Sequence, residues 1–111
     1  MDFDNNKPIY LQISDNLCEH ILAGDLRAED RILSVRELGA EIGVNPNTVA
    51  RAYEKLTDAG IIYTKRGLGY YVAPGAREVV LEAERKAFLE TEWPKLLKRA
   101  SLLDIDLKKL L

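Results

Sequence analysis

The chain has 111 residues, of which 47% are hydrophobic and 31% charged, with a net charge of −2. That apolar content excludes a disordered chain, and the length suits one compact domain with a short appendage. No apolar run approaches the roughly 18 residues of a membrane span, so we expect no membrane partner.

Residues that could carry chemistry are sparse. Cys18 is the only cysteine and His20 the only histidine. One of each excludes an internal disulfide and falls short of the ligands of a structural zinc site. No nucleophile–base pair, carboxylate dyad or metal set stands out, so we expect no enzyme, no cofactor and no metal. The N-terminus lacks the basic-then-apolar order of a secretory signal, which favours a cytoplasmic protein.

The first predicted helix opens at Lys7-Pro8 and stops at Gly24. Its apolar residues recur every four positions and form one stripe, made of Ile9, Ile13, Leu17 and Ile21. A loop over 25–33 follows. Ser34 and Glu37 then form the S-x-x-E pattern of a capping box, which predicts a second helix ending at Gly43. We expect this helix to bury Val35, Leu38 and Ile42.

A third helix is predicted directly afterwards, with Asn45 as its N-cap and Pro46 in its first turn. Its inward-facing residues are expected to be Val49, Ala52, Tyr53 and Leu56. After Gly60, two short strands are predicted over 61–64 and 70–73, joined by a basic, glycine-containing turn over 65–69. Helix, turn, helix and hairpin in this order predict a winged helix-turn-helix, which places one helix in the DNA major groove.

Pro74-Gly75 marks a predicted boundary between a DNA-binding domain (1–75) and a helical dimerisation tail (76–111). Pro94 is expected to kink or split the tail helix, and Asp106 to cap a last short helix. The tail carries more apolar residues than an isolated helix pair can bury. Those expected to pack against a second copy are Val80, Ala83, Ala87, Phe88, Trp93, Leu96 and Leu97. The alternative is that the tail folds back onto its own winged domain. The predicted fold class is therefore mainly α with a small β-hairpin (α+β).

The DNA-facing residues follow from the docking geometry of such motifs. The N-terminal turn of the third helix offers Asn45, Asn47 and Thr48 to base edges. Arg51 and Lys55 follow Asn47 on the same helical face. Further candidates are Pro46 in the same turn, Arg36 near the start of the second helix, and Lys65, Arg66 and Gly67 at the hairpin.

Each of these residues also has a plainer interpretation. Asn45 can cap its helix without touching a base, and Arg51 and Lys55 can be solvated charges, with Arg51 paired to Glu54. Residues 1–75 carry eight Lys/Arg and eleven Asp/Glu, a net charge of −3. That balance leaves open a winged module that binds protein instead of DNA. Between Arg31 and Val72, however, six basic residues face four acidic ones.

The sequence resembles a known family over residues 7–73. SVRELGAEIGVNPNTVARAYEKLTDAGII at 34–62 and KRGLGYYV at 65–72 closely resemble the DNA-binding domain of GntR-family bacterial transcription regulators. PIYLQI at 8–13 resembles the family's opening, and NPNTV at 45–49 and LLDIDLKKLL at 102–111 resemble its YtrA subfamily. The resemblance implies DNA contacts at Arg36, Asn45, Asn47, Thr48 and Gly67. Many family members have a base-reading Arg where this chain has Pro46, and Pro where it has Leu33.

The resemblance also implies a homodimer that binds an inverted repeat in double-stranded DNA through the third helix and the wing, near transporter genes. We expect a repressor of a palindromic operator. A small-molecule effector of unknown identity would act at the dimer interface or in a cleft between tail and winged domain, with Tyr10 and Trp93 as candidate lining residues. The competing function is a protein-interaction module without specific DNA binding.

Overall fold

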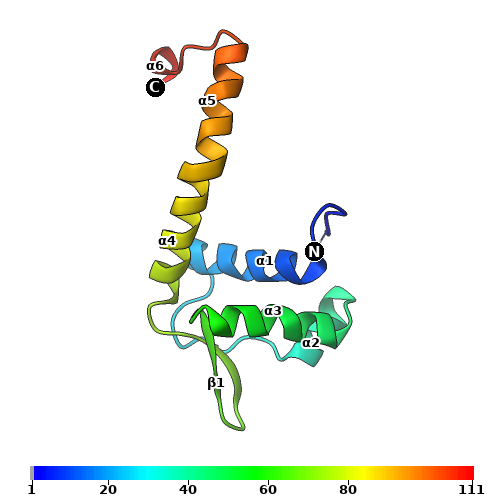
Figure 1. Cartoon of the computed structure of the whole chain (residues 1–111). Coiled ribbons are helices and arrows are strands. Elements are labelled where there is room, and N and C mark those ends of the chain that lie inside the picture. The colour runs from blue at the N-terminus through cyan, green and yellow to red at the C-terminus, as the bar shows by residue number, and fades with distance from the viewer. Residues whose placement is uncertain (1) are drawn as a thin grey trace. The chain divides into compact units, whose positions relative to one another are not determined.

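The computed structural model describes residues 2–111 (Figure 1). The helices and strands are α1 (Ile9–Ala23), α2 (Val35–Ile42), α3 (Pro46–Asp58), β1 (Ile62–Lys65), β2 (Gly69–Val72), α4 (Ala76–Ala87), the π-helical turn η1 (Phe88–Glu92), α5 (Trp93–Leu102) and α6 (Leu107–Leu110). The prediction of a mainly helical chain with one antiparallel hairpin is confirmed. The chain divides into two compact units, Met1–Val80 and Leu81–Leu111. The first residues of α4 therefore belong to the first unit.

In the first unit, α1 packs against α3, as Figure 1 shows with α1 in blue and α3 in green. Pro8 is the N-cap of α1, and Gly24 ends the helix in the left-handed region at φ +85°. Ile13 and Ile21 are buried at 2% exposure and Leu17 is half-buried. Ile9 departs from the predicted stripe, because it is 41% exposed at the first position of the helix.

Helices α2 and α3 both begin as predicted. The Ser34 hydroxyl accepts the Glu37 amide (3.1 Å), and the Glu37 carboxylate accepts the Ser34 amide (3.0 Å). The Asn45 side chain accepts the amide of Asn47 (2.8 Å), so Asn45 caps α3. Gly39 is required where the helices meet, since a Cβ there would lie 2.7 Å from the Val44 carbonyl oxygen. The four residues predicted to face inward from α3 are all buried: Val49, Ala52, Tyr53 and Leu56.

The three apolar residues of α2 are less buried than predicted. Val35, Leu38 and Ile42 are half-buried and pack against the edge of the core. A helix of eight residues at the surface of a small unit covers the core with one side only. The sequence therefore predicted correctly which side of α2 faces the core, but it did not predict that these side chains stay half-exposed.

Compared with the prediction, β1 starts and ends one residue later and β2 one residue earlier. β1 and β2 pair from Ile62 with Val72 to Lys65 with Gly69, so Lys65 lies in a strand and not in the turn. The tip uses left-handed backbone at Gly67 (φ +75°). The loop before α2 pairs with β2, because the Ile32 amide donates to the Tyr70 carbonyl (3.0 Å). This backbone pairing holds the hairpin against the three-helix core.

The second unit, residues 81–111, contains helices and no strand, with a short turn over 103–106 between α5 and α6. Pro94 falls in the first turn of α5, directly after η1, where its missing amide costs little. The predicted interruption at Pro94 thus takes the form of a π-helical turn. Asp106 caps α6 by accepting the Lys108 amide (3.0 Å), as predicted. Among the residues described, no helix combines the length and apolar character needed to cross a bilayer.

Candidate nucleic-acid interface

A surface hollow of about 590 Å³ gathers the residues at the start of α2 and α3. Its lining comprises Val35, Arg36, Asn45, Pro46, Asn47 and Ala50. Four of these residues were predicted to face DNA, and the structure brings them together on one surface. Ala50 was missed, although it follows Asn47 by three positions and so shares its helical face. Because the side chain of Ala50 is small, a bound molecule can come close to α3 at this position.

The polar groups around this hollow are oriented by the helix start. The oxygen of the Asn45 side chain is engaged by the Asn47 amide, so its Nδ2 is the group able to donate to a base or phosphate. Asn47 is exposed and Thr48 is half-buried. The helix dipole favours an anion at this end, although Pro46 has no N–H and the amides of Asn47 and Thr48 already donate to Asn45. Both the capping and the contact interpretation of Asn45 can therefore hold together.

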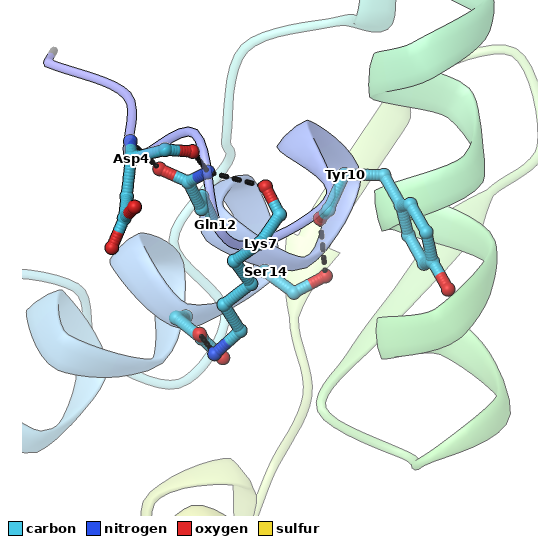
Figure 2. Close-up of polar contacts among 6 residues, drawn as sticks. Asp4, Lys7, Tyr10, Gln12 and Ser14 are labelled. Carbon is cyan, nitrogen blue, oxygen red and sulfur yellow. Dashed lines mark hydrogen bonds and ion pairs between the residues drawn. The ribbon is translucent and has the colours of Figure 1, made fainter.

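Arg51 is positioned by an aromatic ring that the sequence prediction did not connect with it. Its guanidinium carbon lies 4.0 Å from the centre of the Tyr10 ring. Figure 2 shows Tyr10 projecting from α1 towards α3. The alternative pairing with Glu54 is replaced by this cation–π contact. Arg51 and Lys55 are exposed, as predicted, with Arg51 on the side of α3 that faces α1.

The segment before α1 is held against the first turns of that helix by side-chain hydrogen bonds. The Gln12 side chain accepts the Asp4 amide (2.7 Å) and donates to the carbonyl oxygens of Asp4 (2.6 Å) and Lys7 (2.7 Å), as Figure 2 shows. The ammonium of Lys7 also contacts the carboxylate of Asp15. Sequence reasoning missed Gln12, because a glutamine early in a helix carries no pattern that points to its partners.

Lys65 lies at the end of β1, beside the tip of the wing and not in the turn where it was predicted. Its ammonium lies 3.5 Å from the Glu29 carboxylate and 4.3 Å from the centre of the Tyr71 ring. The Tyr63 hydroxyl donates to the same carboxylate at 2.5 Å, and this hydrogen bond raises the pKa of Tyr63. Because Glu29 offsets the charge of Lys65, Arg66 remains as the tip cation among the residues predicted there.

Arg31 links the wing to α2 and was not predicted to take part. Its Nε donates to the Leu68 carbonyl oxygen at the wing tip (3.3 Å), and its guanidinium lies 3.9 Å from the Glu37 carboxylate. The pKa of Glu37 is lowered, chiefly by the hydrogen bond from the Ser34 amide. The only sequence signal was a basic residue in the loop just ahead of a capping box.

The residues predicted to form a dimer interface divide into two groups. Val80 is buried at 2% exposure in the core of the first unit, so it offers no surface to a second copy. The exposed group consists of Ala83, Ala87, Phe88, Trp93, Leu96 and Leu97. The rings of Phe88 and Trp93 lie 6.2 Å apart, centre to centre. Across residues 2–111, no three His, Cys, Asp or Glu side chains gather as metal ligands would.

Comparison with known proteins identifies the family. The family described as "Bacterial regulatory proteins, gntR family" matches residues 9–72. The HTH-type transcriptional repressor YtrA of Bacillus subtilis is 36% identical over 110 residues, covering 99% of this chain and 84% of that protein. A GntR family transcriptional regulator from Listeria monocytogenes superposes with a TM-score of 0.76 at 36% identity, over 97% of this chain and 93% of that one.

A further solved structure is the DNA-binding domain of AraR in complex with its operator ORR3. It matches with a TM-score of 0.59 and 26% identity, over 66% of this chain and 88% of that one. These relatives are transcriptional regulators and not enzymes, which agrees with the sequence expectation. The chain therefore belongs to the GntR family of bacterial transcriptional regulators, as a DNA-binding protein with a winged helix-turn-helix.

Proposed function

We propose that this protein is a repressor that binds a palindromic operator as a homodimer. The observation that carries the proposal is the shared hollow lined by Arg36, Asn45, Asn47 and Ala50 at the exposed start of α3. It combines a cation, the side-chain amide of Asn47, the Nδ2 donor of Asn45 and a small residue that admits the duplex. Arg66 and Gly67 at the wing tip then contact the backbone or the minor groove.

In this proposal Arg51 contacts a phosphate at the edge of the groove. The Tyr10 ring holds its guanidinium 4.0 Å away and restricts its motion before DNA arrives. A positioned cation loses less conformational entropy on binding than a free one. Lys55, one turn further along α3, makes a second and weaker contact of the same kind.

Dimerisation is proposed through the unit Leu81–Leu111, where Phe88, Trp93, Leu96 and Leu97 are between 36% and 50% exposed. Burying these side chains between two copies removes apolar surface from water. Two copies then present their third helices to half-sites about 34 Å, or a multiple of it, apart. This assigns residues 1–80 to the DNA-binding unit and 81–111 to dimerisation, so the proposed boundary lies five residues after the predicted one at 75.

The direct test is selection of bound fragments from random or genomic DNA, followed by binding measurements at increasing salt. We expect an inverted repeat and an affinity that falls steeply with salt, because phosphate contacts release counterions. If no fragment binds even at low salt, the protein-interaction module becomes the better assignment. Because a bacterial regulator of this kind acts on the chromosome, the proposal includes a cytoplasmic location.

A further inference from the structure

A second cavity, separate from the hollow at α3, lies within the first unit between α1, the loop over 25–33, α2 and α3. Its volume is about 340 Å³, within the range of roughly 300–1,000 Å³ usual for small-molecule sites. Apolar side chains dominate its wall, namely Leu17, Leu26, Ile32 and Leu38, whereas His20 and Arg31 supply polar groups. An apolar wall with a few convergent polar groups is the composition of a ligand pocket.

The charged groups of this cavity indicate the chemistry of its ligand. The imidazole of His20 is already engaged, since its Nδ1 lies 3.0 Å from the Asp25 carboxylate. Arg31 is held more loosely. Its contact with Glu37 is 3.9 Å long, its bond to Leu68 is 3.3 Å long, and its side chain is 56% exposed. Glu37 itself is committed to the Ser34 amide. A carboxylate on a ligand can offer Arg31 a shorter, two-pronged contact.

We propose that this cavity binds a small carboxylic acid with a compact apolar body, whose carboxylate pairs with Arg31. The apolar body contacts Leu17 and Leu38 and leaves the anion at the polar rim. This effector site lies within the winged unit, in contrast to the expected cleft beside the tail.

Arg31 connects the proposed ligand site to the wing. The same guanidinium bonds to the Leu68 carbonyl at the tip, beside Arg66 and Gly67. The Arg31 backbone forms an isolated bridge with Tyr71 of β2. A ligand that draws the guanidinium into the cavity breaks the bond to Leu68 and changes the position of the tip. The effect on operator affinity rests on the proposed function, whereas ligand binding itself does not.

The test titrates the full chain, labelled with ¹⁵N, with three acids and their matched neutral amides: octanoate, 4-phenylbutyrate and indole-3-acetate. We expect at least one acid to give saturable shifts at the backbone amides of Leu17, Leu38 and Leu68, with a Kd of about 1 mM or below, and its amide to bind at least about 10-fold more weakly. Arg31→Gln should reduce the affinity for the acid to that for the amide. Arg31→Lys should restore part of it, and Arg66→Gln should leave it unchanged.

The proposal is overturned if no acid saturates these shifts, if acid and amide bind equally, or if the shifts map outside the cavity. Spectra of the two Arg31 variants without ligand check that the fold is retained. The coupling is measured separately as operator affinity with and without saturating acid, where an unchanged affinity refutes it. Absence of operator binding without any acid would contradict the proposed function and leave the ligand result standing.

Discussion

The two compact units place their apolar side chains in opposite ways. In the unit Met1–Val80, large residues such as Ile13, Leu56 and Ile62 are at most 2% exposed. In the unit Leu81–Leu111, the buried hydrophobic residue is Ala100, while Trp93 and Leu96 are 36% and 50% exposed. The first unit therefore completes its own core and works through its polar surface. The second unit exposes its large apolar side chains, and an exposed apolar patch of this kind marks a surface that binds another chain.

The substitution Leu96→Asp should have the largest effect. A charge at the centre of the proposed dimer interface should yield a monomer, because burying an unpaired carboxylate is unfavourable. Operator affinity should then fall by about 10²–10⁴-fold, since two linked half-sites no longer bind together. Analytical ultracentrifugation and fluorescence anisotropy measure the two effects. Lys98→Gln on the same helix is the control, and a dimer that persists in Leu96→Asp would refute the tail assignment.

On the polar surface of the first unit, Asn47→Ala should have the next largest effect. Loss of one bidentate base contact costs about 1–3 kcal/mol and relaxes sequence preference at a single operator position. Binding to a panel of operators with single base changes measures this. Arg66→Ala serves as comparison, because loss of a phosphate contact weakens all sequences evenly. Equal losses across the panel for Asn47→Ala would show that Asn47 reads no base.

Tyr10→Leu should weaken operator binding about 2- to 5-fold, because an exposed cation–π contact contributes about 0.5–1 kcal/mol. Leucine keeps the apolar contact with the core and removes the aromatic face under Arg51. The informative measurement is a double-mutant cycle with Arg51→Ala. If Tyr10 acts by holding Arg51, its replacement should have no further effect once Arg51 is absent. Additive losses of affinity would show that Tyr10 and Arg51 act independently.

Glu29→Gln should increase affinity for DNA of any sequence by a few-fold. The substitution frees the charge of Lys65, which can then contact a phosphate, and the slope of log affinity against log salt should steepen by about one unit. Anisotropy titrations at several salt concentrations measure the slope. The double variant Glu29→Gln with Lys65→Gln is the control and should return the slope to that of the parent. An unchanged slope in Glu29→Gln would show that Lys65 lies away from DNA.

The smallest expected effect concerns stability and pH. The pKa of Glu37 is lowered below its ordinary 4.5, chiefly by the hydrogen bond from the Ser34 amide. A lowered carboxylate pKa stabilises the fold above the ordinary value, and this contribution is lost as the pH falls through the lowered folded value. The stability difference between the parent and Glu37→Gln should therefore shrink below about pH 4.5. Urea unfolding at several pH values checks this, with Glu41→Gln on the same helix as control.

The signals that the chain carries locally were sufficient for the first unit's architecture. The capping box at Ser34 and Glu37, the cap at Asn45 and the glycine stop at Gly24 act over three to four residues, so sequence spacing alone reveals them. The burial of Val49, Ala52, Tyr53 and Leu56 follows from helical periodicity in the same way. The same local signals predicted Arg36, Asn45, Pro46 and Asn47 as neighbours on one surface, and these four residues line the hollow at the start of α3.

The contacts that position the cations of the candidate interface depend on packing between segments far apart in the sequence. Arg51 meets Tyr10, Lys65 meets Glu29 and Arg31 meets Leu68, and each pair is separated by more than thirty residues. Val80, although it shares the apolar character of the tail, turned out to belong to the first unit's core. The sequence identifies the charged and apolar side chains that need a partner. How the helices and the hairpin pack decides which group lies within 3 to 4 Å of each of them. That is why the residues gathered at the start of α3 could be predicted from the chain, whereas the partners of Arg51, Lys65 and Arg31 needed the folded molecule.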